Sequence, residues 1–534
     1  MNPSADAPLR TSRRFGGRWL RPTLVCLGAW VALVVIFYAE EDWRGQRDWN
    51  RYRQAKEALG EHLEFRAYIP KPVPDAENFA ETPIVKSWLS EASFFTNDLY
   101  ARADAYVYAG NTKAVPYYHR QFTDLVAWQT ASDALKSGEL IPDTTRPSLT
   151  SLPLSTQHFE TDKTDLATRA SAAPAVLEGL KPDEADFTEL RLASGRTHSR
   201  FPLQYDLDDS ARTLLWHLAK IKAACLPLNL QACAELAGGE TDKAAADVKL
   251  MLYLADSVKT EPFLLSFLVR AACFQIAVQP VWEGLAERRW TEAQLQELQA
   301  RFQHYDFLAD LAQSLKAERA FGILEVDQVK KKGLGLDPLA NIEDIGRTTQ
   351  REEFLNLVGR MMPAGWYELE RLNYCTIFDA KMKGAMDRAA ERVFPGRIAS
   401  NSRQFPDQPE STSLDSILNH RVIAIRVLPF LPKMPIKAAV PQTAANQAAI
   451  ACALERYRLA KGQFPEKLAA LTPQYMSRLP HDVITGQPYK YRRTDDGQFI
   501  LYSVGWNEKD DGGVPGKRLF DDKDGDWVWD YPVK

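Results

Sequence analysis

An uncharged apolar run near the start of the chain is the clearest feature of its hydrophobic pattern. The run extends from Pro22 to Ala39 and ends abruptly at Glu40. As a helix it would be ~27 Å long at ~1.5 Å per residue, close to the ~30 Å of a bilayer's hydrocarbon core. Five arginines precede it: Arg10, Arg13, Arg14, Arg18 and Arg21. Because such clusters stay in the cytoplasm, the pattern predicts a cytoplasmic tail over residues 1–21 and a transmembrane signal anchor over 22–39.

A cleaved signal peptide is the competing interpretation of this segment. Cleavage ahead of Glu40 would place the bulky Phe37 three residues before the cut, where small residues are required. The sequence therefore favours an uncleaved anchor in the inner membrane. The bulk of the chain, including its C-terminus, is then expected in the periplasm.

From about residue 201 to 330 the pattern becomes helical. Apolar residues recur at intervals of 3 and 4, as in these positions: Leu265, Leu268, Ala272 and Ile276. Thr291 and Gln294 have the spacing of a capping box, in which the two side chains satisfy free backbone donors at a helix start. The pattern predicts a multi-helix scaffold domain.

The segment from Cys233 to Val258 resembles one helical hairpin of a tetratricopeptide-type array. Gly238 and Gly239 are expected to end its first helix, with Thr241 as the N-cap of the second. No second copy follows at a fixed period. A regular solenoid and a packed antiparallel bundle therefore both remain open.

The last hundred residues change from helical to alternating periodicity. A helix is predicted over Asn446–Lys461, and Gly462 supplies the left-handed residue that ends it. Three segments alternate as strands do: Tyr489–Arg492, Phe499–Val504 and Trp527–Trp529. The turn residues Asp495–Gly497 join the first two as a hairpin. The pattern predicts an α+β domain with a small antiparallel sheet.

The predicted fold class is mainly α, with several parts along 534 residues. Six parts are expected: tail 1–21, anchor 22–39, helical and loop juxtamembrane region 40–200, helical scaffold 201–330, helical extension and loop 331–440, and α+β domain 441–534. A net charge of -4 lacks the basic excess of a nucleic-acid binder, so no nucleic-acid partner is expected. The scattered cysteines indicate no disulfide framework. Cys225 and Cys233 either pair across the bend at Pro227 or are two buried thiols.

Four motifs in the C-terminal region follow one another in a specific order: Leu454–Pro465, Leu479–Asp482, Gly486–Tyr489 and Leu501–Asn507. Together they resemble the globular head of the major pseudopilin of type II secretion, a relative of type IV pilins. Two features depart from that family: Val483 stands where the family has proline, and the apolar anchor lies far upstream of the head. The whole chain also resembles large, single-anchored bacterial envelope proteins that carry this tail. The resemblance implies the inner membrane and envelope or secretion-system proteins as partners.

The same resemblance implies a calcium site, because the pseudopilin head holds this ion in the loop after its last motif. The matching loop here offers five oxygen ligands: Asn507, Asp510, Asp511, Asp524 and Asp526. Calcium takes about six to eight hard oxygens, and unneutralised carboxylates would repel one another. The alternative is a solvated acidic loop balanced by nearby lysines.

No catalytic signature is present in the sequence. It contains no nucleophile-elbow, zinc-protease, phosphate-loop or dinucleotide motif, and its eight histidines are isolated. His304-Tyr305-Asp306 is either an acid/base group or a surface cluster at a helix end. The favoured hypothesis is a non-enzymatic, single-pass membrane protein with a binding or assembly role. An envelope hydrolase and a secretion or pilus component are the alternatives.

Overall fold

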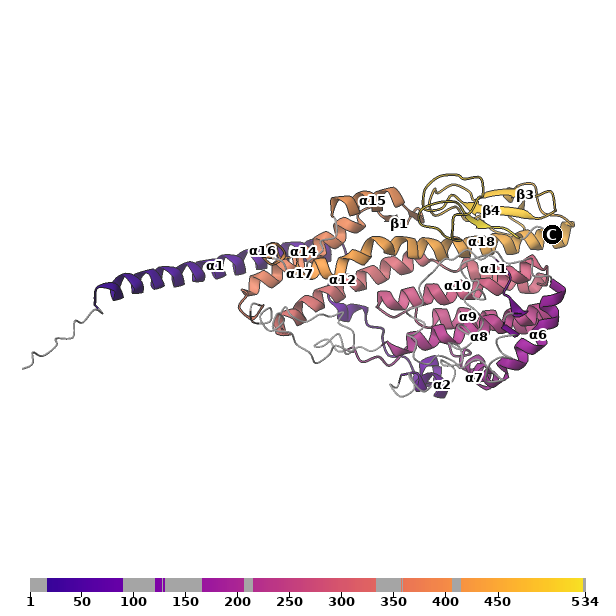
Figure 1. Ribbon diagram of the computed structural model, residues 1–534, viewed down its shortest axis with the longest axis horizontal. Helices are drawn as coiled ribbons and strands as arrows, with labels where there is room; N and C mark the ends of the chain where they lie inside the picture. Colours follow the sequence, from indigo (N-terminus) through magenta and orange to yellow (C-terminus); the bar gives the residue numbers. More distant parts are fainter. Residues whose placement is uncertain are drawn as a thin grey trace, which may run out of the picture. The chain divides into compact units, whose positions relative to one another are not determined.

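The described chain is mainly helical, with two small antiparallel sheets near the C-terminus (Figure 1). The computed structural model describes residues 17–89, 121–126, 128–129, 166–205, 215–332, 357, 359–405 and 414–531. The predicted mainly helical class is confirmed at this level.

The chain divides into two compact units. Unit 1 comprises Met1–Glu61, Val326–Cys375 and Glu410–Ala424, and unit 2 comprises His62–Glu325, Thr376–Pro409 and Ile425–Lys534. The described helices of unit 1 are α1 (Gly17–Ala58), the end of α12 (Phe307–Lys332), most of α14 (Ala364–Met382), α16 (Leu414–Leu418) and the start of α17 (Val422–Val427). The α-helices that lie wholly in unit 2 are α2 (Pro83–Ser87), α6 (Leu166–Leu180), α7 (Glu184–Ala193), α8 (Trp216–Gly238), α9 (Thr241–Asp256), α10 (Leu264–Ala286), α11 (Glu292–Gln303), α15 (Pro395–Gln404) and α18 (Met434–Lys461).

Short 3₁₀ helices and strands complete unit 2. The 3₁₀ helices are η1 (Phe65–Tyr68), η2 (Asp75–Glu77), η3 (Phe79–Glu81), η6 (Lys181–Asp183), η9 (Leu428–Lys433) and η10 (Leu468–Leu471). The strands are β1 (Met386–Asp387), β2 (Arg392–Val393), β3 (Lys490–Arg493), β4 (Phe499–Ser503) and β5 (Trp527–Trp529).

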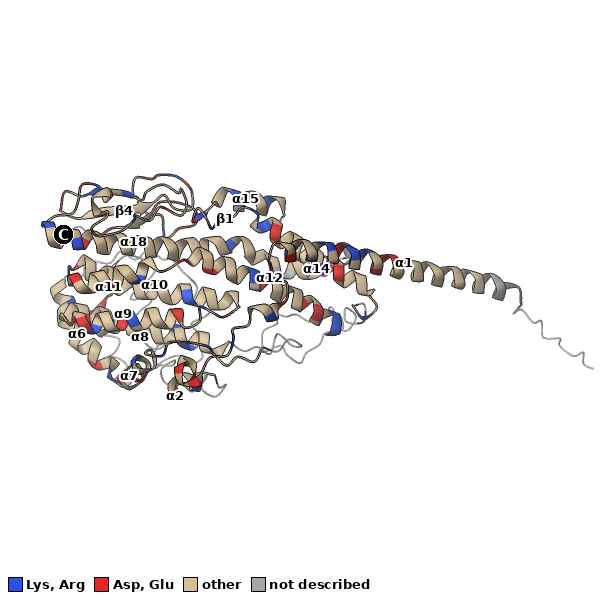
Figure 2. Cartoon of the chain, turned by 180° about the vertical axis from the view of Figure 1, so that it is seen from behind, with Lys and Arg blue, Asp and Glu red and all other residues tan. Residues whose placement is uncertain are grey.

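The apolar segment near the N-terminus is part of one continuous helix, α1. Large side chains along it, from Leu24 to Phe37, are exposed, and Figure 2 shows this length of α1 without charged residues. Among the described helices, α1 and α10 are long and apolar enough to cross a membrane. Because α10 is mostly buried inside unit 2, packing in the core of that unit explains its apolar side chains. The segment predicted as an anchor therefore has the length and the exposed apolar surface that such a role requires.

Glycine allows α1 and α14 to touch within unit 1. A Cβ on Gly45 would lie 2.2 Å from the carbonyl oxygen of Gly365, and a Cβ on Gly365 would lie 2.1 Å from that of Glu41. Real Cβ atoms do not approach so closely, so both positions need glycine. Asp42 Oδ1 accepts a hydrogen bond from Gly365 N at 2.6 Å, which satisfies a free donor at the start of α14.

Helices α8, α9 and α10 form the core of unit 2, with α6 against α8 and with α11 and α10 against α18. Gly239, with φ of 84°, ends α8, as predicted. The capping box of Thr291 and Gln294 is present at the start of α11. Thr241, in contrast, is the first residue of α9, and the N-cap position belongs to Glu240 without a side-chain bond. The prediction for Thr241 was wrong by one residue.

The larger sheet has strand order β3-β4-β5, antiparallel throughout. Lys490 pairs with Tyr502, and Leu501 pairs with Trp529. The hairpin between β3 and β4 turns at Gly497, whose φ of 76° matches the predicted turn. Gln447 of α18 donates to the carbonyl of Trp527 at 2.7 Å, which fixes the sheet against this helix.

Helix α18 is longer than the sequence pattern predicts. It begins at Met434 instead of Asn446 and contains Pro441. Gln442 supports this extension: its Oε1 accepts from Phe307 N at 2.7 Å and its Nε2 donates to Tyr305 O at 3.1 Å. Packing thus outweighs the local cost of the proline. The predicted boundary at 441 falls inside α18, those at 22 and 40 fall inside α1, and the one at 331 falls inside α12. The division into six parts stays a prediction.

Candidate functional site

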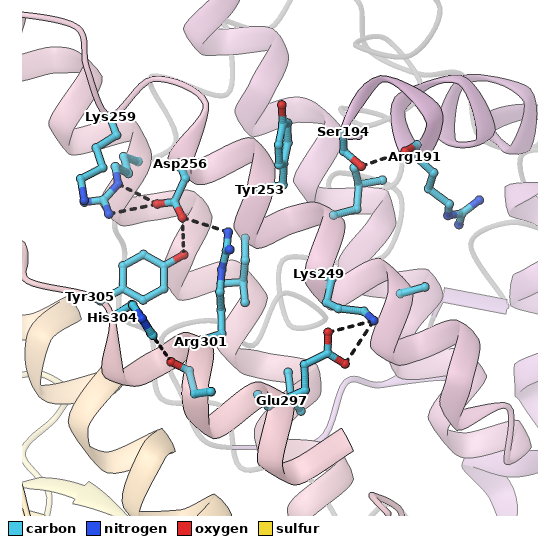
Figure 3. A pocket seen from close by; sticks show the side chains of 16 residues that line it. Arg191, Ser194, Lys249, Tyr253, Asp256, Lys259, Glu297, Arg301, His304 and Tyr305 are labelled. Carbon is cyan, nitrogen blue, oxygen red and sulfur yellow. Dashed lines mark hydrogen bonds and ion pairs between the residues drawn. The ribbon is translucent and has the colours of Figure 1, made fainter. Parts of the chain in front are cut away.

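A cleft of about 670 Å³ in unit 2 is lined by residues of α7, α9 and α11 (Figure 3). Two helical faces build it. Lys249, Tyr253 and Asp256 follow one another at intervals of 4 and 3 on α9, and Glu297 and Arg301 are four apart on α11, three residues before His304. The charged residues that line the cleft comprise five cations and two carboxylates: Arg191, Lys249, Lys259, Arg270, Arg301, Asp256 and Glu297.

Asp256 connects three of the side chains that line this cleft (Figure 3). It accepts hydrogen bonds from Arg270 Nε at 3.0 Å, from Arg301 Nη2 at 3.0 Å and from the Tyr305 hydroxyl at 3.2 Å. Burial, followed by the charge of Asp256, raises the pKa of Tyr305 above its ordinary value. With three donors on its oxygens, Asp256 organises the cleft instead of serving as a free base.

Arg191 pairs with Asp247, and the other four cations of the cleft fall into two groups. Arg270 is buried and is held by Asp256 and Asp310. Lys249, Lys259 and Arg301 have side chains that are 50%, 47% and 44% exposed. Pairs between such exposed charges are weak, so a ligand anion can replace their present partners. The exposed side of the cleft is therefore suited to bind carboxylate or phosphate groups.

Among the described residues that line the cleft, Ser194 and His304 each contact a backbone carbonyl and not each other. Ser194 donates to the carbonyl of Arg191 at 2.8 Å, and His304 Nδ1 lies 2.6 Å from the carbonyl of Ala300. Asp306 caps Ala309 N at 2.8 Å. The acid/base group considered for His304-Tyr305-Asp306 is not formed, because Tyr305 bonds to Asp256 instead.

A second cleft, of about 660 Å³, is lined by α6, α8, α9 and Glu184 with Arg191 of α7. Glu235 of α8 lines it, and Asp247 of α9 is fully buried nearby. Burial, followed by the charge of Asp247, raises the pKa of Glu235 to about 8. Burial raises the pKa of Asp247 to about 6, although Arg191 at 2.6 Å opposes this shift. Each side chain has one buried oxygen without a hydrogen-bond partner among the described residues. Near neutral pH, Glu235 is thus a protonated carboxylic acid and Asp247 is a carboxylate.

Three residues of hydrolase type meet in the core of unit 2. His217 Nε2 lies 2.7 Å from Glu261 Oε1, and the Ser266 hydroxyl donates to Glu261 Oε2. In a hydrolytic triad the histidine stands between the serine and the acid, whereas here the glutamate stands in the middle. All three side chains are buried. This group is a structural cluster.

The structure gathers part of the predicted calcium ligands. Asn507 Nδ2 donates to Asp511 Oδ2 at 3.0 Å, and Asp511 N donates to Asp526 Oδ1 at 3.2 Å. Asp510 Oδ1 accepts a hydrogen bond from the Tyr502 hydroxyl at 3.0 Å. Asp524 is exposed, and its backbone amide donates to Asp521 Oδ1. Among the described residues, no group of three or more His, Cys, Asp or Glu side chains is arranged to hold a metal. The calcium site stays a prediction.

Other sequence features have simpler outcomes. Cys225 and Cys233 are both free and buried, so the interpretation as two buried thiols is confirmed. The charged residues of α9 and α11 recur at helical spacing in the sequence, but no signal in the sequence shows that these two helix faces lie beside each other.

Comparison with protein-family models, with curated protein sequences and with solved structures gave no match.

Proposed function

We propose that this chain is a single-pass inner-membrane protein whose periplasmic helical unit binds an acidic segment of an envelope protein. The exposed apolar length of α1 and the arginines before it support the anchor and its orientation. The role is binding and assembly, without catalysis.

The observation that carries this proposal is the set of exposed cations in the cleft around Asp256. Lys249 projects from α9, Arg301 from α11 and Lys259 from the turn after α9, so the packing of these helices sets the backbone positions from which the cations reach the cleft. Preorganised cations bind carboxylates with less loss of conformational entropy than flexible ones. The volume of about 670 Å³ does not choose between a small anion and a peptide, so the proposal of an acidic segment rests on these cations.

A pair of matched variants tests the proposal. The full chain, reconstituted in lipid nanodiscs, is titrated with a fluorescent glutamate-rich peptide. We expect Lys249→Gln/Lys259→Gln to weaken binding about tenfold, which corresponds to ~1.4 kcal/mol. The control is Lys181→Gln/Lys243→Gln, which removes two lysines of the second cleft whose side chains are 69% and 67% exposed. Binding by the wild type should also weaken as salt is raised from ~50 to ~500 mM. Equal affinity in both variants would contradict the proposal.

The finer architecture is part of the same proposal. The tight α8–α9 hairpin and its packing on α10 support a tetratricopeptide-like scaffold. Helix α18 with the β3-β4-β5 sheet supports a pseudopilin-like head, which would dock secretion-system or other envelope proteins. In this view calcium binds the loop that carries Asn507, Asp511 and Asp526 and stiffens it.

A hydrolytic function is the second candidate, and the Glu235–Asp247 pair favours it. Glu235 lines the second cleft and, protonated beside the buried Asp247, can act as a general acid on a ligand there. The test measures hydrolysis of peptidoglycan fragments by the full chain and by Glu235→Gln. Activity that is present in the wild type and lost in the variant would support this function over the binding role.

A further inference from the structure

Exposed apolar side chains gather in unit 1 where the apolar length of α1 ends. Trp43 and Met361 are each 62% exposed, and Leu418 is 72% exposed. The three come from α1, from the turn before α14 and from α16, which are far apart in the sequence. Large apolar side chains exposed singly are ordinary, but a gathering beside a membrane-spanning candidate indicates a surface with a partner.

Contacts with α1 place these residues at one level. The Tyr38 hydroxyl donates to the carbonyl oxygen of Met361, and Glu41 Oε1 lies 2.5 Å from Nε2 of His420, two residues after Leu418. Tyr38 to Glu41 is only ~5 Å of helix at ~1.5 Å per residue. Met361 is therefore tied to the last turn of the apolar run, and Leu418 lies two residues from a contact with the first turn beyond it.

Of the acidic groups at this level, Glu41 is turned inward and Asp42 is partly buried, whereas Glu40 is 54% exposed. Glu41 is buried and pairs with Arg44 at 2.5 Å as well as with His420. Asp42 is used by the start of α14. Trp43 remains on the outside, where Arg47 lies 4.5 Å from its ring centroid. Tryptophan with a nearby arginine is typical of the headgroup layer of a bilayer.

We infer that Trp43, Met361 and Leu418 form a collar that is immersed in the outer headgroup layer of the membrane that α1 crosses. The partner is the lipid surface, because the contacts of Tyr38 and Glu41 put the collar at the end of the exposed apolar surface of α1. The inference rests on the proposed passage of α1 through the bilayer. A collar of this kind would hold unit 1 against the membrane by more than its single helix.

Depth-dependent quenching tests the collar in the full chain. Cys26 is the exposed thiol among the six cysteines and is replaced by serine, since the other five are buried. Single cysteines are then placed at Met361 or Leu418, at Val31 within the apolar run, and at Leu59. Leu59 is the matched control: it is 74% exposed and lies just past the end of α1, ~30 Å along the helix from Tyr38. Each protein is labelled with a fluorophore and reconstituted in vesicles of phosphatidylcholine and phosphatidylglycerol that carry nitroxide lipids.

We expect shallow nitroxides to quench labels at 361 and 418 several-fold more than the label at 59, and deep nitroxides to quench the label at 31. If position 31 is quenched while 361 and 418 behave like 59, the collar is wrong and the anchor stands. If position 31 is not quenched by any lipid, α1 does not cross the bilayer, and the proposed function fails along with the collar. Unchanged circular dichroism verifies that each labelled variant is folded.

Discussion

Glu235 and Asp247 are the residues through which pH should act most directly on the stability of unit 2. Burial raises the pKa of Glu235 to about 8 and that of Asp247 to about 6, both above the values expected in an unfolded chain. The folded state therefore binds these protons more tightly than the unfolded state does. Stability is highest below the unfolded pKa values and falls as pH rises from ~4.5 to ~8.

Glu235→Gln should remove most of this dependence, because glutamine keeps the shape and cannot ionise. At pH 8 we expect the variant to be more stable than the wild type by ~1–3 kcal/mol, and the difference to shrink toward pH 5. Thermal unfolding followed across this pH range measures the effect. The exposed Glu240, changed to glutamine, is the control and should leave the profile as it is. A constant offset at all pH values would contradict the assignment.

The acidic C-terminal loop permits a residue-scale test of calcium. If the ion binds, a concentration of 100 times its dissociation constant stabilises the fold by ~2.7 kcal/mol. Asp526 is unsuitable for mutation, since its carboxylate accepts from the amides of Asp511 and Gly513 and so holds the loop itself. Asp511→Asn is suitable because Asp511 is exposed and lies with Asn507 and Asp526 in the proposed site. We expect calcium to raise the melting temperature of the wild type and to do so less in this variant. Asp495→Asn, in the exposed β3–β4 turn, should respond like the wild type.

At the scale of elements, local signals in the sequence were sufficient at two glycines and at the cap of α11, but not at the cap of α9. Gly239 ends α8, Thr291 caps α11, and the turn at Gly497 joins the predicted strands. The extension of α18 could not be predicted, because Gln442 stabilises it through bonds to residues more than a hundred positions away. The cleft was missed for the same reason. Its two charged helix faces are visible in sequence, but their juxtaposition depends on tertiary packing.

The contact between α1 and α14 is the element-scale feature most sensitive to a single methyl group. In Gly365→Ala the new Cβ would lie 2.1 Å from the carbonyl oxygen of Glu41, so the two helices must separate. We expect a loss of about 3 kcal/mol in the stability of unit 1. Hydrogen exchange of the amides in α14 measures this loss. Gly28→Ala is the control, because nothing lies within 4 Å of the Cβ that it adds, and its exchange should equal that of the wild type.

At the scale of the whole molecule, the C-terminal sheet and the helical scaffold belong to the same packed unit. Trp282 of α10 donates to the carbonyl of Asp530 at 2.9 Å, and Gln299 of α11 donates to that of Tyr475 at 2.7 Å. A deletion of residues 441–534 would also remove most of α18, against which α10 and α11 pack. A loss of secretion after that deletion would therefore not distinguish a missing docking module from an unfolded scaffold.

A chain that ends after Lys461 keeps α18 whole and removes only the sheet and its loops, which makes it the sharper experiment. It loses Trp527 and Trp529, both fully buried, and truncation of a buried tryptophan alone costs ~3–5 kcal/mol. Two such losses approach the ~5–15 kcal/mol that stabilises a typical domain. We therefore expect the shortened chain to lose the trypsin resistance of helices α8 to α11, measured in detergent at matched concentration. The control is the full chain with Leu459→Gln, an exposed change on α18 that should leave the digestion pattern intact. If the shortened chain gives the same resistant fragment as the full one, the sheet is an independent domain that the scaffold can lose without unfolding.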